Sequence, residues 1–203
     1  MQKKLTKRKL QAEETKKKII TVAKQLIEEH GYENVSVDAV VQKAGISKGA
    51  FYVHFESKDA LAEILIEDNV RAADLNYQAF LNTMDPTTEI TDVLLQLIEK
   101  IAAVIESVGC ENMKALYKTH LTKSDSSASA WRYNREIYVL FRNVLEKGIQ
   151  QGDIKPGLPP DLLAKHCVLA LRGVTFEWCI RYPEFDLRQE CMKHFQILLR
   201  GIV

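Results

Sequence analysis

The sequence predicts an all-α protein with an N-terminal three-helix bundle and a larger C-terminal helical domain. Apolar residues recur at helical spacing through most of the 203 residues, and glycines stand where several of these patterns end. Residues 36–55 hold two short helical patterns on either side of a glycine. We expect the N-terminal domain to span residues 1–58 and the C-terminal domain to span residues 59–203. With 46% apolar residues, the chain can bury a sizeable core.

The first 14 residues are predicted to form a basic arm. Residues 1–18 contain eight Lys and Arg against two Glu, and no apolar periodicity begins before Ile19. Such an arm could reach a DNA minor groove, although charge runs are more often solvated tails that add nonspecific affinity. From about Thr15 to His30 the apolar residues follow a helical period, and Gly31 can end that helix.

Residues 36–55 are predicted to form a helix-turn-helix. Ser36 can cap the first helix and Ser47 the second, because each hydroxyl can accept a hydrogen bond from a backbone N–H. Gly45 stands at the turn between them, where glycine takes a positive φ without steric cost. An ordinary helical hairpin with a basic face is the alternative, which the combined caps, turn and aromatic residues disfavour.

The second of these helices is predicted to have a buried face and a DNA-facing side. Phe51 and Phe55 lie four residues apart and are expected to pack against the first helix. Small Gly49 and Ala50 would let the helix start approach the DNA closely. Lys48 could reach guanine or a phosphate, and the sequence leaves both possibilities open.

The run from Ile19 through Lys58, with AGISKGAFYVHFESKDAL at its centre, resembles the N-terminal domain of TetR-family (tetracycline-repressor-like) transcriptional regulators. The resemblance implies a three-helix DNA-binding domain, an all-helical ligand-binding and dimerisation domain, and repression relieved by a small molecule. By position in the motif, it implies DNA contacts at Ser36, Ser47, Lys48, Gly49, Ala50, Tyr52, His54 and Lys58. Beyond about residue 65 it implies nothing for individual residues.

The charge distribution agrees with DNA as a partner. Residues 1–60 contain 12 Lys and Arg against 8 Asp and Glu, a net +4, whereas the remainder has 16 against 19, a net −3. A positive segment on a nearly neutral protein is the electrostatic footprint of a phosphate-binding module. We therefore expect double-stranded DNA with a near-palindromic site as the partner, read by a homodimer.

The C-terminal domain is predicted to contain helices of strongly apolar character. Ser57 is expected to cap a long helix that runs toward Phe80 and links the two domains as a mechanical lever. Further helices are expected from Thr87 or Thr88 to about 108, over 111–121, from Ser129 to about 151, over 160–182 and over 185–202.

Two sets of residues in this domain are candidate sites. Aromatic side chains and one charged neighbour could line a cavity for a partly apolar effector, although such residues are more often core: Phe80, Tyr117, Trp131, Tyr138, Phe141, Phe176 and Glu177. Apolar residues of the last two helices could form a four-helix dimer interface, unless they form only an intramolecular core: Leu163, Leu171, Val174, Trp178, Phe195 and Leu198.

Other function classes find little support in the sequence. The four cysteines are widely spaced and expected to be buried reduced thiols, and the histidines show no metal-ligand spacing, so no metal or cofactor is expected. The chain shows no nucleophile elbow or phosphate loop of an enzyme, no signal peptide and no membrane span, which favours a cytoplasmic location. A DNA-binding regulator without an effector, controlled by a partner protein or by abundance, is the alternative function.

Overall fold

A computed structural model of the chain describes residues 7–122, 135–155 and 157–201. In this part of the chain all regular secondary structure is α-helical, as predicted. The chain divides into two compact units, Met1–Asp68 and Asn69–Val203. Each unit has its own hydrophobic core. Within the described ranges, no helix is both long enough and apolar enough to cross a bilayer.

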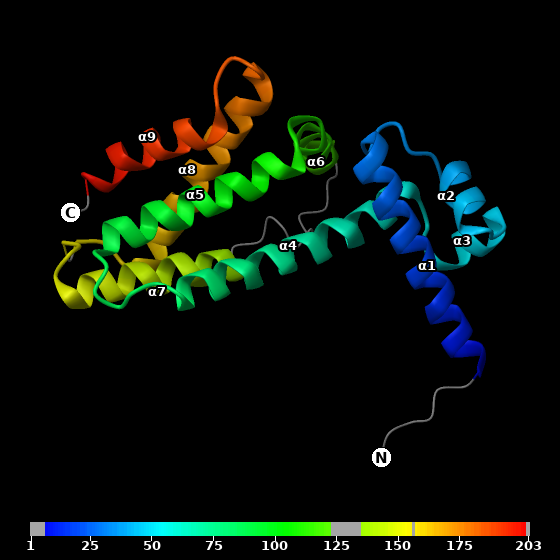
Figure 1. The fold of residues 1–203 in the computed structure, drawn as a ribbon, viewed down its shortest axis with the longest axis horizontal. Coiled ribbons are helices and arrows are strands. Elements are labelled where there is room, and N and C mark those ends of the chain that lie inside the picture. The colour runs from blue at the N-terminus through cyan, green and yellow to red at the C-terminus, as the bar shows by residue number, and fades with distance from the viewer. Residues whose placement is uncertain (1–6, 123–134, 156, 202–203) are drawn as a thin grey trace. The chain divides into compact units, whose positions relative to one another are not determined.

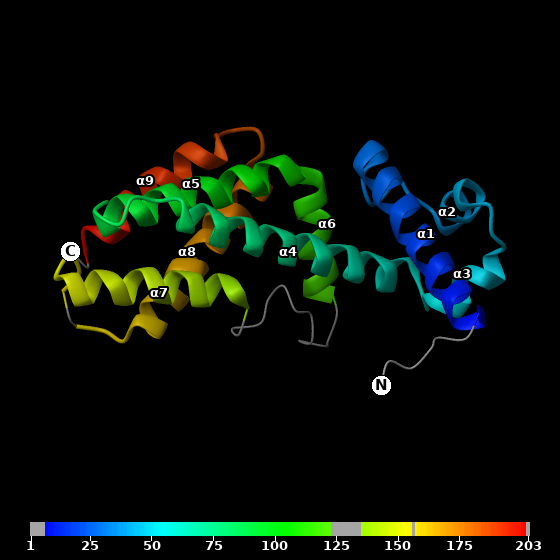
Figure 2. The same cartoon turned by 60° about the horizontal axis from the view of Figure 1, so that its bottom comes forward.

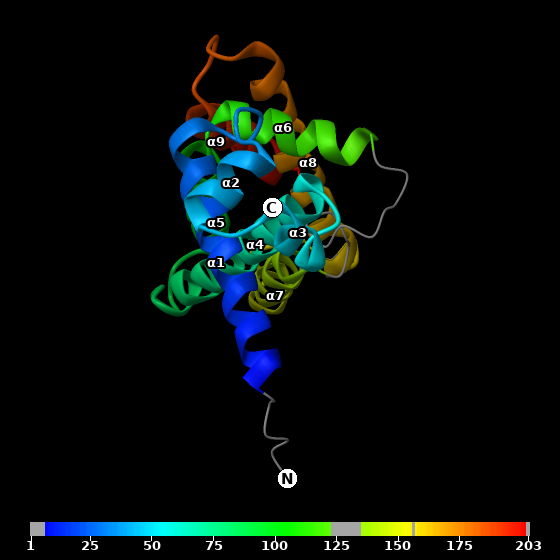
Figure 3. The same ribbon diagram turned by 90° about the vertical axis from the view of Figure 1, so that its right-hand side faces the viewer.

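The first unit contains α1 (Lys7–His30), α2 (Val37–Ala44), α3 (Lys48–His54) and the start of α4 (Lys58–Asn82). Helix α1 packs mainly against α2, and Figure 3 gives a view of these helices. The core cluster of this unit draws on all four helices, on the α1–α2 connection and on the residue that follows α3: Ile19, Val22, Ala23, Leu26, Val35, Val40, Val41, Ala44, Phe51, Phe55, Leu61 and Leu65.

Helix α1 begins earlier than predicted. The prediction of an arm over residues 1–14 is wrong for residues 7–14, which are helical. Their sequence, KRKLQAEE, consists of residues with high intrinsic helix propensity. The helix can therefore extend past its apolar face, and a search for apolar periodicity misses this extension.

Helix α4 supplies side chains to both cores. Its predicted cap is confirmed, since the Ser57 hydroxyl accepts a hydrogen bond from the Ala60 amide at 3.0 Å. Leu61 and Leu65 belong to the core of the first unit, whereas Tyr77 belongs to that of the second. The division therefore falls after Asp68, inside α4, and not after residue 58 as predicted.

The second unit is built from the rest of α4 with α5 (Ile90–Val108), α6 (Cys110–Thr122), α7 (Glu136–Gln151), α8 (Pro160–Arg181) and α9 (Leu187–Leu199). The most extensive helix pairs are α7 with α8 and α5 with α9. Figures 1 and 2 both show α5 and α9 side by side. The core of this unit draws on every one of these helices.

The start of one helix differs from its prediction, and the start of another cannot be compared with its prediction. Helix α5 begins at Ile90 without a side-chain cap. Thr87 does not cap it, because its amide and hydroxyl both donate to the Asp85 carboxylate, at 2.8 and 2.7 Å, and so form a local turn. The predicted helix start at Ser129 lies outside the described residues, and α7 is helical from Glu136.

Candidate nucleic-acid interface and effector-domain cavities

The turn between α2 and α3 has the predicted geometry. Ser36 Oγ accepts from the Ala39 amide and Ser47 Oγ from the Ala50 amide, both at 3.1 Å. Gly45 has φ 61° and ψ 41°, the left-handed conformation that glycine adopts without strain. These local interactions fix the direction in which α3 leaves the turn.

Helix α3 is anchored by its aromatic face. Phe51 is fully buried and Phe55 nearly so, and their ring centroids lie 5.6 Å apart. On the other side, Tyr52 is 50% exposed and Val53 is 80% exposed. Val53 was not among the predicted contacts, yet its position on the solvent side of a short helix makes it available to a thymine methyl group.

The remaining predicted DNA contacts occupy different environments. Ser36, Ser47, Lys48 and Gly49 are exposed, while Ala50 and His54 are half-buried. Lys48 Nζ lies 2.8 Å from Asp38 Oδ1, and this hydrogen bond raises the pKa of Lys48. A phosphate or base acceptor would therefore have to replace Asp38 as the partner of this ammonium group.

Lys58 has a structural role that the sequence did not suggest. Its Nζ donates to the carbonyl oxygens of Tyr32 at 2.8 Å and Val35 at 2.7 Å, and lies 4.2 Å from the centre of the Tyr32 ring. The Tyr32 hydroxyl in turn donates to Asp59, and burial together with this carboxylate raises the Tyr32 pKa. Lys58 thus ties the start of α4 to the α1–α2 connection, and its predicted DNA contact would require it to leave these acceptors.

Neither the backbone conformation nor the contacts within the protein require glycine at position 49. Its φ is not in the left-handed region, and a Cβ at this position would meet only Ser47 Oγ, at 3.8 Å. A helical glycine costs about 0.5–1 kcal/mol relative to alanine. Contacts within the protein would therefore tolerate an added methyl group at this position.

We expect Gly49→Ala to raise the free energy of unfolding by about 0.5–1 kcal/mol and to weaken DNA binding. The added methyl group would cost about 1–3 kcal/mol if it is forced into a packed contact with DNA. Chemical denaturation and a DNA titration measure the two changes, which have opposite signs. Ala60→Gly, on the first turn of α4, is the reverse control and should lower stability. Unchanged DNA affinity in Gly49→Ala would place this face away from the nucleic acid.

The predicted effector residues do not gather at one site. Tyr117 and Phe176 do meet, with ring centroids 5.3 Å apart in an edge-to-face arrangement. They line an open groove of about 400 Å³ together with Lys114, Lys118, Leu121, Cys179 and Ile180. The groove is largely apolar, with two lysines among its lining residues.

The other predicted effector residues lie elsewhere. Tyr138 and Phe141 are buried in the core of the second unit, and Phe80 is half-buried on α4. Glu177 is at the surface, where it accepts a hydrogen bond from Arg181 one helical turn away. Trp131 lies outside the described residues. Aromatic composition did not distinguish a cavity wall from the core, because both need large apolar side chains.

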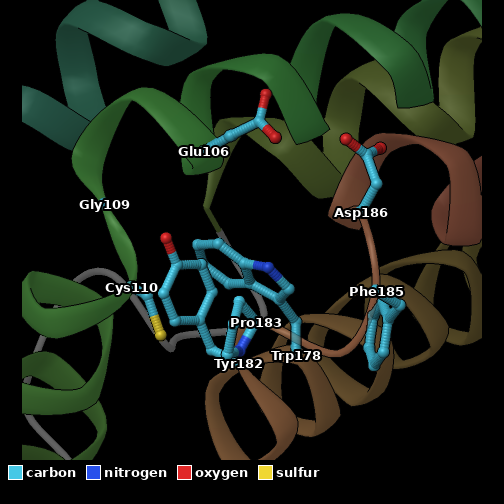
Figure 4. A pocket seen from close by; sticks show the side chains of 8 residues that line it. All are labelled: Glu106, Gly109, Cys110, Trp178, Tyr182, Pro183, Phe185 and Asp186. Carbon is cyan, nitrogen blue, oxygen red and sulfur yellow. The ribbon is translucent and has the colours of Figure 1, made fainter.

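A second cavity, of about 330 Å³, was not predicted. It is lined by two acidic and three aromatic side chains together with small neighbours: Glu106, Gly109, Cys110, Trp178, Tyr182, Pro183, Phe185 and Asp186 (Figure 4). These residues come from the end of α5, the start of α6, the end of α8 and the α8–α9 connection. These segments are far apart in the sequence, so no local motif predicted the cavity.

A buried ion pair was also not predicted. Arg135 Nε and Nη2 donate to the two carboxylate oxygens of Asp74, at 2.9 and 2.7 Å. Asp74 is only 4% exposed, which makes it the most buried carboxylate among the described residues. The pair joins α4 to the start of α7. Bidentate geometry of this kind partly offsets the cost of removing both charges from water.

The cysteines are buried, and their burial makes the thiols unreactive. All four are free and buried, as expected. Burial raises the pKa of Cys167, Cys179 and Cys191 to about 12. At neutral pH such thiols contain almost no reactive thiolate. Among the residues that the structure describes, no group of three or more His, Cys, Asp or Glu is placed to hold a metal ion.

The predicted dimer residues mostly lie inside the protomer. Five of the six are buried in the core of the second unit, and Leu198 is half-buried: Leu163, Leu171, Val174, Trp178 and Phe195. Four of these five lie on the inner of the two apolar faces of α8 and Phe195 lies on α9, so in the protomer they form the intramolecular core that the sequence left as the alternative. The outer face exposes other residues at alternating spacings of four and three, here called the α8 stripe: Leu162, His166, Leu169, Gly173, Phe176 and Ile180.

The amino-acid sequence is similar to those of known bacterial regulatory proteins. Residues 19–65 match the family described as bacterial regulatory proteins, tetR family. The chain is 27% identical to the HTH-type transcriptional regulator AcrR of Shigella flexneri over 203 residues, which cover 95% of this chain and 91% of AcrR. The likeness therefore extends through both units.

Two solved structures have a similar fold. One is a TetR-family transcriptional regulator from Pectobacterium atrosepticum, with a TM-score of 0.75, 20% identity and 98% coverage of each chain. The other is the transcriptional regulator FadR from Bacillus subtilis in complex with stearoyl-CoA, with a TM-score of 0.70 and 20% identity, covering 92% of this chain and 99% of that one.

Proposed function

The chain belongs to the tetR family of bacterial regulatory proteins, and on that premise we propose that it is a homodimeric repressor, released from a near-palindromic operator by a small-molecule effector. It is a DNA-binding transcriptional regulator with a helix-turn-helix. Such a regulator works beside the chromosome, in the cytoplasm.

The geometry of α3 is the observation that best supports DNA reading. Phe51 and Phe55 anchor the helix in the core, while its exposed side carries a cation, a phenol, a small apolar group and a glycine whose added Cβ would meet only Ser47 Oγ. Rigid placement of short and polar side chains is what contact with base edges and phosphates requires. We assign direct contacts to Lys48, Gly49, Tyr52 and Val53, and helix-start contacts to Ser36 and Ser47.

Dimerisation is proposed to use the α8 stripe. Leu162, Leu169 and Ile180 are exposed on its outer face, and exposed apolar patches of this kind mark protein interfaces. A Cβ at Gly173 would meet nothing within 4 Å, so this glycine leaves room for an external group. A second α8 related by a two-fold axis could approach closely here. The dimer would present two copies of α3 to successive half-sites about 34 Å apart.

Two cavities are candidates for the effector site. The groove beside Tyr117 shares Phe176 and Ile180 with the α8 stripe, so a second subunit seated on the stripe would cover part of it. The cavity beside Trp178 shares no residue with the stripe. It would stay open in the dimer, which favours it as the place where a small molecule enters.

Selection of bound fragments from a random double-stranded DNA library, with full-length protein at near-physiological salt, tests the proposed function. Enrichment of an inverted repeat would support a dimeric, sequence-specific reader. A pool without enrichment would contradict sequence-specific reading by the unliganded protein.

We expect Lys48→Ala to weaken binding to the selected operator about 5- to 150-fold, because it removes a cation from the exposed face of α3. Lys24→Ala is a matched control on α1. Both lysines are about half exposed, at 54% and 52%, and each pairs with one carboxylate. Titrations of the same DNA with both variants measure the difference. Equal losses would show that only net charge matters and would contradict the assigned contact.

A further inference from the structure

The cavity beside Trp178 has two chemically different sides. In Figure 4 the carboxylates of Glu106 and Asp186 lie on one side, and the rings of Trp178 and Tyr182 lie across from them. The two rings stand edge to face, with centroids 5.6 Å apart and an interplanar angle of 87°. Aromatic faces and carboxylates both attract cations. None of the eight lining side chains carries a positive charge.

The carboxylates of this cavity retain unused acceptor capacity. Asp186 uses Oδ1 to accept the Gln189 amide at 2.8 Å, which caps α9. Glu106 is exposed, and its carboxylate takes part in no side-chain hydrogen bond or ion pair within the described ranges. Arg181 pairs with Glu177 and Arg188 pairs with Glu99. The pKa of Arg188 is raised mainly by Glu99 and also by the charges of Glu106 and Asp186, so the carboxylates of this region outnumber its arginines. The local excess of charge is therefore negative.

The Trp178 indole provides a second, independent indication of a ligand. Trp178 is only 3% exposed, yet its indole nitrogen is not among the fully enclosed polar atoms without a partner in the described residues, so it is accessible from the cavity. Its nitrogen lies on the edge of the ring toward the two carboxylates in Figure 4. The indole nitrogen is a donor only, so an acceptor atom brought by a ligand into the cavity can bond to it.

From this arrangement we propose that the cavity binds an organic cation that also carries a hydrogen-bond acceptor oxygen. The ammonium group lies between the aromatic rings and the Glu106 and Asp186 carboxylates, and the oxygen accepts from the Trp178 N–H. An anionic ligand is disfavoured by the two carboxylates. The inference rests on the proposed function only where it makes this cation the effector that releases DNA.

Charge selectivity is the first test. Isothermal titration calorimetry of the full chain compares acetylcholine with 3,3-dimethylbutyl acetate, which has the same shape and ester but no charge. We expect one acetylcholine per chain and at least tenfold weaker binding of the neutral ester. Equal affinities, or no heat with either probe, would overturn the proposal.

Two variants locate the site. Glu106→Gln should weaken acetylcholine binding at least tenfold, whereas Glu146→Gln, the same exposed change on α7, should leave it unchanged. Trp178→Phe keeps a ring but removes the N–H, so it should weaken acetylcholine more than tetramethylammonium, which has no acceptor. Circular dichroism checks that each variant is folded. Equal sensitivity of both glutamate variants would overturn this location.

The regulatory step is measured separately from binding. Acetylcholine is added to the complex with the selected operator, and release of DNA should follow its binding curve. Operator binding without any cation binding would overturn this inference and leave the proposed function standing. Cation binding in a protein that enriches no operator would support the site and contradict the proposed function.

Discussion

Replacing Asp74 by alanine is expected to lower the free energy of unfolding by about 3–5 kcal/mol. The substitution leaves the Arg135 guanidinium without its bidentate partner in a mostly buried position. An unpaired charge there loses its water without compensation. Denaturant unfolding followed by circular dichroism measures the change. Glu67→Ala, an exposed change on the same helix, should alter stability by less than about 0.5 kcal/mol.

A double replacement separates the ion pair from the space that it fills. Asp74→Leu combined with Arg135→Met should recover most of the lost stability, because apolar groups of similar volume need no desolvation of charge. A loss of less than about 1 kcal/mol in Asp74→Ala would show that water reaches the pair, as it does at surface ion pairs.

Ile180→Glu is expected to convert the proposed dimer into monomers and to weaken operator binding about 100-fold or more, because linked half-site binding is lost. The substitution places two like charges near each other across the proposed two-fold interface. Sedimentation velocity and operator titration measure the two effects. Leu75→Glu on α4 is the matched control, since Leu75 is 66% exposed and Ile180 is 62% exposed. A variant at Ile180 that remains dimeric would place the interface elsewhere.

The helix-turn-helix could be predicted almost to the residue because its signals are local. Ser36 and Ser47 each cap the helix that follows directly, by accepting from the amide three residues ahead, and Gly45 needs only its own backbone conformation to mark the turn. Phe51 and Phe55 are related by one helical turn, so their shared burial follows from helical geometry. The start of α1 was missed because the extension relies on propensity without an apolar face.

The residues of the C-terminal sites could not be chosen from the sequence. Helix α8 has apolar residues on two faces, and only its packing against α6, α7 and α9 decides that Leu171 is buried and Leu169 exposed. The cavity beside Trp178 joins Glu106 to Asp186, which are 80 positions apart in the chain. Arg135 and Asp74 likewise meet only through tertiary structure, so no spacing rule could pair them.

The two separate cores have a consequence for how such regulators can diversify. Residues 66–72 of α4 belong to neither core, and Glu67, Asp68 and Asn69 are exposed. A genetic crossover within this stretch would transfer the whole first unit, with its core, and leave the second unit intact. The helical phase of α4 would be preserved. New pairings of operator and signal can therefore arise by recombination in one step, without a new core having to evolve.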